Sequence, residues 1–290
     1  MSNSINALNR MTGLLIIEAR NSNPNGDPDS DGDPRQRHDR RGMISGVSFK
    51  RKLRDLVETI EGPVWQTLSS ELAINTAQFQ ILESRGRNRE EIDKKTGTEM
   101  QAEYWDARVF GSTYLKAEGV KKKESTTDFI QAGAIQFGNG VSIAPIRIER
   151  MTTTNKAGVE QDKDRGMAPL GYRVVEHGVY AMPFFLNPTA AVKSGCTQID
   201  IELLKRLIPL AYSHSAAYGR PNVGMRHAWL IEHSSPLGSC SDFALLDALT
   251  PKKRSDQENP SISWDDYDDP VKLPDTLQQR VKPLIDLVMP

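Results

Sequence analysis

Long apolar runs are absent from this sequence of 290 residues. No stretch of about 18 or more consecutive apolar residues, the length that a helix needs to cross a bilayer, occurs in it. The first ten residues, MSNSINALNR, also lack the apolar segment of a secretory signal peptide. These absences argue against a helical membrane protein, and we expect a cytoplasmic protein with no membrane partner.

Cysteine is scarce. Cys196 and Cys240 are the only two, and they lack the C-x-x-C spacing that zinc and redox sites use. Two cysteines in a chain of this size do not make a disulfide framework. We therefore expect buried free thiols, and we expect neither a metal ion nor a cofactor.

Net charge is also small, at −1, but the charges are distributed unevenly. Residues 255–290 hold eight acids and three bases, a local charge of −5. Residues 35–54 hold eight bases against a single acid, Asp39, a local charge of +7 in twenty positions. Such a cluster is a candidate for binding an anion, whatever the charge of the whole chain.

Secondary structure follows from the spacing of apolar residues. The apolar run at 12–21, TGLLIIEARN, predicts a strand buried on both faces. Between 48 and 60, apolar residues recur with the helical period and the pattern stops at Gly62-Pro63, which predicts a helix. We further expect strands within 131–186, a helix at 200–212, a strand at 225–233, and helices near 241–249 and 275–288 on either side of an acidic, disordered linker.

With residues 62–130 set aside as an insertion, the predicted order is β-α-β-β-α-β. This is the ferredoxin-like split arrangement, which is also the layout of the RNA recognition motif, so the sequence predicts an α+β fold. Such a fold hosts many unrelated functions and does not by itself indicate one.

The loop NPNGDPDSDGDPR, residues 23–35, begins like a calcium-binding loop, with Asp27, Asp29 and Asp31 before a glycine. The twelfth position, where such a loop needs a bidentate acid, is His38, and no helix is expected before the loop. We interpret the segment as a preformed cluster of turns, because Asn, Gly and Asp accept left-handed backbone angles and Pro fixes turns.

The helix that follows carries Lys50 and Arg54 one turn apart, with Arg51 beside them and next to the apolar stripe. We place these cations in the first turn, where they oppose the helix dipole, which favours an anion at that end. A helix start reinforced by lysine and arginine is a ready phosphate site.

The combination of NSNPNGDPDSDGDPR and RGMISGVSFKRKLRD resembles the signature of the backbone subunit of type I CRISPR–Cas surveillance complexes (Cascade), in its subtype I-C and I-B form. A second region, from FGNGVSIAPIRIERMTTTNK to MRHAWLIEHSSPLG, is similar to the same family, which belongs to the RAMP superfamily. This resemblance implies a modified RNA-recognition-motif palm at 12–61 and 131–240, a fingers insertion at 62–130, a thumb at 143–172, and C-terminal helices with an acidic linker at 241–290.

The resemblance also implies a function without catalysis. Several copies of the chain would line up along one CRISPR RNA and present it for pairing with target DNA in antiviral defence. The other implied partners are the large subunit, the small subunit and the subunit that holds the 5′ end of the CRISPR RNA. Where the family usually has threonine and aspartate before the helix, this chain has Ser45 and Gly46.

The implied RNA-binding residues come from four segments. Residues of the helix would contact the RNA backbone, helped by the end of the first strand and by the loop, while a methionine at either flank of the thumb would wedge beside a displaced base. These residues are Lys50, Arg51 and Arg54; Arg20 and Asn21; Arg35 and Arg37; and Met151 or Met167.

Two alternatives remain open at the level of sequence. The first is a metal-dependent ribonuclease that uses the aspartates of the loop, as the related type III subunits do. The second is a calcium-binding or scaffold protein that holds no nucleic acid. Copurified RNA and magnesium-dependent cleavage of matching RNA distinguish them from the binding function.

Overall fold

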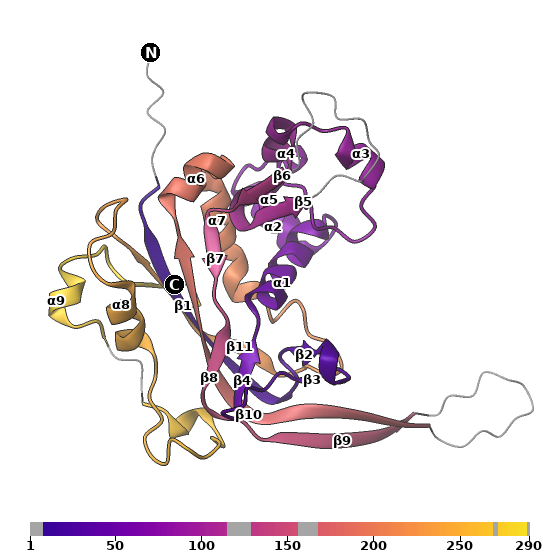
Figure 1. The fold of residues 1–290 in the computed structure, drawn as a ribbon, viewed down its shortest axis with the longest axis vertical. Helices are drawn as coiled ribbons and strands as arrows, with labels where there is room; N and C mark the ends of the chain where they lie inside the picture. The colour runs from indigo at the N-terminus through magenta and orange to yellow at the C-terminus, as the bar shows by residue number, and fades with distance from the viewer. Residues whose placement is uncertain (1–7, 115–128, 156–167, 269–271, 289–290) are drawn as a thin grey trace, which may run out of the picture.

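A computed structural model describes residues 8–114, 129–155, 168–268 and 272–288. Its centre is an eight-stranded antiparallel sheet in the order β12-β11-β1-β10-β8-β4, in which β7 and β9 also pair with β10 (Figure 1). Along the chain, β1 precedes helix α1, β8 and β10 lie between α1 and helix α7, and β11 and β12 follow α7. The sheet strands are β1 (Met11–Ser22), β4 (Arg41–Ile44), β7 (Ile135–Phe137), β8 (Gly140–Pro145), β9 (Ile148–Asn155), β10 (Ala168–Leu186), β11 (Val223–Glu232) and β12 (Ile285–Asp286).

Strand β1 lies in the middle of this sheet, between β10 and β11. Leu15 and Ile17 are buried on one face of the sheet, while Leu14 and Ile16 are buried on the other. Side chains alternate along a strand, so a strand covered on both faces reads as a continuous apolar run. The strand predicted at 12–21 is therefore confirmed.

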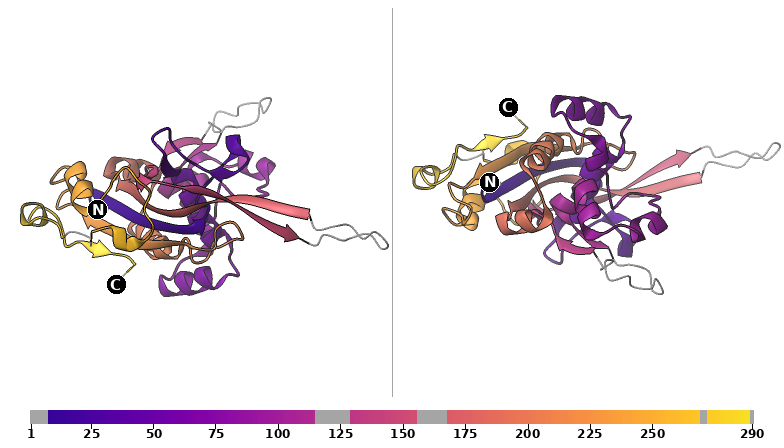
Figure 2. Two further views of the ribbon diagram at one scale, coloured as in Figure 1. Left: turned by 90° about the horizontal axis from the view of Figure 1, so that it is seen from below. Right: turned by 90° about the horizontal axis from the view of Figure 1, so that it is seen from above.

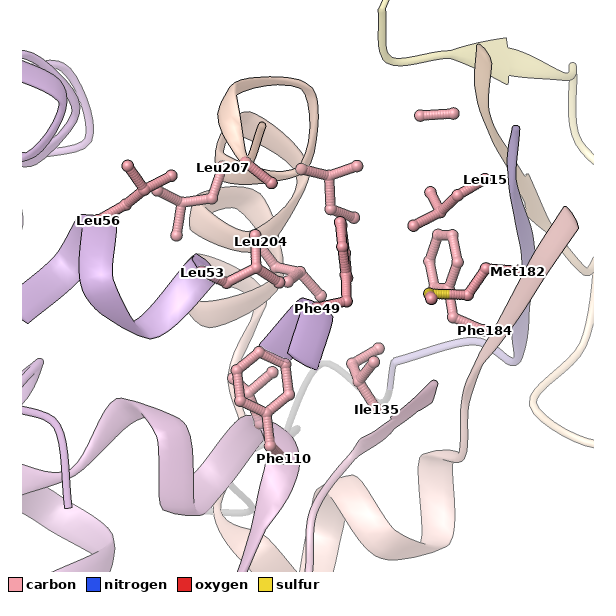
Figure 3. Close-up of a cluster of buried hydrophobic side chains, with 14 of the residues drawn as sticks. Leu15, Phe49, Leu53, Leu56, Phe110, Ile135, Met182, Phe184, Leu204 and Leu207 are labelled. Carbon is pink, nitrogen blue, oxygen red and sulfur yellow. The ribbon is translucent and has the colours of Figure 1, made fainter. Parts of the chain in front are cut away.

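Helices α1 (Gly46–Glu58) and α7 (Gln198–Leu207) cover the first face. Phe49 and Leu53 from α1 lie near Leu204 from α7, on the side of the main core that faces Met182 of β10 (Figure 3). Burying a side chain of this size stabilises the fold by about 1.5–3 kcal/mol. The apolar stripe that predicted α1 is thus its contact with the sheet.

The second face is covered by the C-terminal segment, which runs from α8 (Asp242–Leu249) to Leu284, just before β12. Leu245 and Tyr267 pack on Leu14 and Trp229, and Figure 1 shows this segment on the side of the sheet away from α1. Tyr267 is 2% exposed, so the expectation of a disordered linker is wrong for residues 250–268.

The expected terminal helix at 275–288 is also wrong. α9 spans only Asp275–Gln278, and the chain then joins the sheet as β12, where Ile285 pairs with Leu230 of β11. Pro283 explains the change, because proline has no N–H to donate and is not accommodated in a helix interior.

The insertion after α1 folds into short elements beside the sheet, on the side where α1 lies (Figure 1). Two buried ion pairs connect it to the rest of the chain, one between Arg54 and Asp106 and one between Arg108 and Asp200. Its elements are α2 (Pro63–Glu71), α3 (Arg89–Asp93), α4 (Gly97–Glu103), α5 (Trp105–Phe110), β5 (Gly111–Tyr114) and β6 (Phe129–Ala132); α6 (Pro188–Ser194) follows β10.

β9 and the first half of β10 form a two-stranded ribbon that leaves the body of the molecule. The pairing runs from Ile148 opposite Val175 to Asn155 opposite Ala168. All views in Figures 1 and 2 show the ribbon projecting from the sheet. Among the described residues, no helix is long and apolar enough to cross a membrane.

Candidate nucleic-acid interface

Residues 23–35, hereafter the turn cluster, fold back on themselves beside the start of α1. The side-chain oxygen of Asn25 accepts a hydrogen bond from the Ser45 amide at 2.8 Å, and its carbonyl accepts one from the Arg35 amide at 3.0 Å. A Cβ atom on Gly26 would lie 2.8 Å from the carbonyl oxygen of Gly32, so only glycine permits this fold. The NPNG segment thus fixes where α1 begins. The cluster contains the short strands β2 (Gly26–Asp27) and β3 (Asp33–Pro34).

Two acids of the turn cluster, Asp27 and Asp33, have partners within the protein. Asp27 accepts a hydrogen bond from the Asp29 amide at 3.3 Å and lies 3.5 Å from the Arg35 guanidinium. Asp33 forms an ion pair with Arg173 of β10, which joins the cluster to the ribbon. In the described part of the chain, no three His, Cys, Asp or Glu side chains are grouped to hold a metal ion. The geometry gives these aspartates turn-forming and ion-pairing roles.

α1 begins at Gly46, two residues before the predicted start. Ser45 is the N-cap, and its hydroxyl accepts the Ser48 amide at 3.2 Å. A Cβ atom on Gly46 would lie 2.7 Å from the carbonyl oxygen of Phe137, so glycine lets the helix start approach β7. With this start, Lys50 is in the second turn. The interpretation of cations opposing the dipole in the first turn is therefore wrong.

Lys50 is half-buried, with its ammonium 5.6 Å from the centre of the Phe110 ring. Burial, together with repulsion from Arg54, lowers the pKa of Lys50. No carboxylate in the described part of the chain pairs with it. Its charge is available to an external anion.

Arg51 and Arg54, in contrast, already have partners. Arg51 Nε donates to Asp55 at 2.7 Å, and its Nη1 donates to the carbonyl oxygen of Glu83 at 2.6 Å. Arg54 is 9% exposed, and its Nε donates to the fully buried Asp106 at 2.8 Å. Both arginines therefore attach α1 to the insertion.

The remaining basic candidates are more open. Arg20, at the end of β1, donates to Glu18 at 2.8 Å and leaves about half of its side chain exposed. It lines an open depression of about 520 Å³ with Arg226 and Asn222. Arg37 lies 3.4 Å from Asp39 at the surface. The backbone at Asn21, φ 44°, is left-handed and turns the chain toward the turn cluster.

Aromatic side chains gather where the ribbon leaves the body. The rings of Tyr172 and Tyr218 lie 5.3 Å apart at 61°, and Tyr218 is 61% exposed. Met151 is opposite Tyr172 in the ribbon and 37% exposed. Cross-strand partners of this kind lie on the same face. Met167 is outside the described residues.

The sequence did not predict RNA contacts for three residues near the ribbon and the turn cluster: Arg150, Arg173 and Tyr218. With Asn23, Arg150 and Arg173 line a cavity of about 300 Å³ between the turn cluster and the ribbon. The pairing of Arg150 with Arg173 across the ribbon depends on strand register. Only a correct prediction of that register would have revealed it.

One face of the central sheet, the face opposite α1 and α7, is unavailable for binding nucleic acid. RNA recognition motifs stack bases on the sheet face opposite their helices. Here, that face is covered by α8 and by Tyr267 and Leu273. Any nucleic acid must therefore follow another surface.

The sequence profile of the family described as CRISPR-associated protein Cas7 matches residues 9–272. The chain belongs to this family. The family identity that the two motif regions suggested is thereby confirmed. A curated CRISPR-associated protein Cas7 from Haloferax volcanii is 25% identical to this Cas7-family chain over 215 residues. The alignment covers 69% of this chain and 63% of the relative's length.

Two chains from solved structures are also similar to this Cas7-family chain. One, from a "CRISPR RNA-guided surveillance complex, pre-nicking", has a TM-score of 0.48 and 13% identity and covers 77% of this chain and 78% of its own. The other, from a "CRISPR RNA-guided surveillance complex", has a TM-score of 0.38 and 15% identity, with coverage of 82% and 75%.

Proposed function

We propose that this Cas7-family chain binds CRISPR RNA as a backbone subunit, without reading its sequence, and presents the bases to target DNA. The observation that carries the proposal is a convergence of three segments on one surface. Asn25 holds the start of α1, Asp33 holds the ribbon, and the amide of Asn23 donates to the carbonyl oxygen of Gly219 in the loop before β11. Lys50 and the aromatic pair lie on these segments, while Arg20 and Arg37 lie just before and just after the turn cluster in the chain.

Sequence-independent binding needs contacts to phosphates and stacking surfaces, because hydrogen bonds to base edges would select a sequence. We assign the phosphate contacts to Lys50, Arg20, Arg35 and Arg37, with Asn21 shaping the strand end. Arg51 and Arg54 hold α1 in position, Arg51 through the carbonyl oxygen of Glu83 and Arg54 through the carboxylate of Asp106.

The ribbon then acts as a thumb. Met151 or Met167 wedges beside a displaced base, and the sheet with α1 and α7 forms a modified RNA-recognition-motif palm. The order β11-β1-β10-β8, with α1 and α7 on one face, supports this assignment. The insertion at 62–130 corresponds to the fingers.

The same proposal includes the assembly. Several copies of the chain line up along one guide, together with a large subunit, a small subunit and a subunit at the 5′ end of the RNA. The protein contributes no catalytic step. Matching single-stranded RNA mixed with the assembled complex and magnesium stays intact, whereas cleavage abolished by Asp27→Ala or Asp29→Ala would make the protein a ribonuclease.

Copurification tests the binding function. We expect RNA to copurify with the wild-type protein and to be visible as excess absorbance at 260 nm. The pair of changes Arg20→Glu and Lys50→Glu removes it, while circular dichroism stays that of the folded chain. Lys252→Glu, an exposed lysine on the C-terminal segment, is the control for charge reversal. RNA that stays bound to the double variant would refute the assignment.

A further inference from the structure

The flank of α1 opposite Lys50 holds a second, more deeply buried lysine. Lys52 is 4% exposed, and its ammonium lies 5.3 Å from the centre of the Tyr212 ring. It makes no hydrogen bond or ion pair with any residue that the structure describes. A buried ammonium costs free energy unless it is paired, and a ring face satisfies it only in part.

Tyr212 has an unpaired polar atom at the same place. The residue is 4% exposed, and its hydroxyl is buried without a hydrogen-bond partner in the described part of the chain. Buried hydroxyls are almost always hydrogen-bonded, so an orphan of this kind needs an explanation. The Lys52 ammonium over the ring face and the hydroxyl at the edge of the same ring are two donors without an acceptor, which suggests that an acceptor is missing.

Arg220 adds a third cation. It is exposed and interacts electrostatically with both Lys52 and Tyr212. Burial, together with repulsion from Arg220, outweighs the attraction of the Asp55 carboxylate and lowers the pKa of Lys52 to about 8. The positive charges of Lys52 and Arg220 therefore repel each other in the RNA-free protein. Bound anionic oxygen would relieve both the repulsion and the unpaired donors.

We propose that Lys52, Tyr212 and Arg220 form a site for one phosphate group, and that the phosphate is a phosphodiester of the bound RNA. The assignment of RNA rests on the proposed function; the anion site itself rests on the three side chains. Lys52 and Tyr212 donate from the buried side, and Arg220 donates from the solvent side. A phosphodiester suits the site because its oxygens accept several hydrogen bonds and are the same in every nucleotide.

The location agrees with the interface. The Arg220 segment runs beside the end of β1, where the Asn222 amide donates to the hydroxyl of Ser22 at 3.0 Å and the Arg20 amide donates to the carbonyl oxygen of Asn222 at 3.0 Å. Tyr218, two residues before Arg220, reaches the base of the ribbon.

If Lys52 and Tyr212 bind phosphate, removing their unpaired polar groups should weaken RNA binding without lowering the melting temperature. A purely structural role predicts the opposite pattern. Lys52→Met keeps the length of the side chain without its charge, and Tyr212→Phe removes only the hydroxyl. We expect the melting temperature of the RNA-free protein to be unchanged or higher in both variants. Affinity for a single-stranded RNA should fall about tenfold in each. Lys52→Met should also reduce the log–log salt slope by about 0.7, the share of one phosphate.

Two control variants remove the same kinds of group, a buried hydroxyl and a lysine charge, at positions outside the proposed phosphate site. Tyr180→Phe removes another buried hydroxyl without a partner among the described residues, and Lys205→Met removes a lysine that is paired with Glu202. We expect both to bind RNA like the wild type. If Lys52→Met and Tyr212→Phe bind RNA with wild-type affinity, or if both lower the melting temperature, the phosphate site is wrong.

Inorganic phosphate tests the anion site independently of RNA binding, and therefore independently of the proposed function. If the wild-type protein binds no RNA, the proposed function fails. The anion site is then judged by whether inorganic phosphate raises the melting temperature of the wild type and not that of Lys52→Met. Equal responses of the two proteins to phosphate would overturn the site.

Discussion

Arg54 Nε lies 2.8 Å from Asp106 Oδ2, and this ion pair joins α1 to the insertion inside the protein. Asp106 is fully buried and also accepts the amides of Leu82 and Glu83, at 2.7 and 3.2 Å. The orientation of α1, and therefore of Lys50 and Lys52, depends on this carboxylate. Arg54 contributes to the candidate interface indirectly, because it holds α1 in the orientation that positions Lys50 and Lys52.

Removal of Arg54 should be costly for the fold. Arg54→Leu leaves Asp106 buried without its counter-charge, and we expect the free energy of unfolding to fall by about 3–5 kcal/mol in urea titrations. Arg51→Leu, whose pairs with Asp55 and Glu58 are more exposed, should cost about 1 kcal/mol or less. Equal losses in the two variants would contradict the role of the buried pair.

Lys50 should contribute one phosphate contact. For Lys50→Gln, we expect the slope of log affinity against log salt concentration to decrease by about 0.7, measured by fluorescence anisotropy with a labelled single-stranded RNA. Arg51→Gln should leave the slope unchanged, because Arg51 is already paired within the protein. A larger change in slope for Arg51→Gln than for Lys50→Gln would reverse the assignment.

The aromatic pair should act independently of salt. Tyr218→Leu removes a ring that we propose stacks on a base, and we expect affinity for RNA to fall between about fivefold and a hundredfold with no change in salt slope. Tyr218→Phe keeps the ring and should bind like the wild type. The idea of a stacking surface fails if Leu and Phe variants bind equally well.

Glu18 links stability to pH. Burial alone would raise the pKa of Glu18, but hydrogen bonds from His177, Arg20 and Arg226 outweigh it and lower the pKa to about 2. Because the folded-state pKa lies below the unfolded value near 4.5, the stabilisation is complete above that value. It is lost as pH falls from about 4.5 toward 2.

The corresponding experiment compares the wild type with Glu18→Gln. The loss of unfolding free energy between pH 6 and acidic pH should be smaller in the variant, by on the order of 3 kcal/mol. Chemical denaturation at each pH measures it. Identical pH profiles would show that Glu18 has an ordinary pKa.

Local patterns predicted the elements that lie against the sheet. The continuous apolar run of β1 and the helical stripe of α1 each reflect contact with the main core, so periodicity alone was sufficient. The start of α1 was misjudged because the N-cap depends on Asn25, twenty residues earlier, which holds Ser45. The C-terminal error has a similar origin, since β12 forms only by pairing with β11.

For the candidate site, the sequence indicated a region but not which of its charges are free. The density of basic residues in 35–54 indicated an anion-binding surface, yet sequence does not show which charges are already paired. Asp106 neutralises Arg54 from 52 positions away in the chain, whereas Lys52 and Lys50 have no such partner among the described residues. Tyr212 and Tyr218 join the site through the loop before β11, which carries no binding motif.

The central claim is that the surface holds RNA by its sugar-phosphate backbone, whatever its sequence. The most direct test measures the dissociation constants of two single-stranded RNAs of equal length and unrelated sequence over a series of salt concentrations. We expect the two constants to agree within about twofold and to weaken together as salt rises, because the contacts are to phosphates. A preference of more than about tenfold for one sequence, with little dependence on salt, would contradict the account.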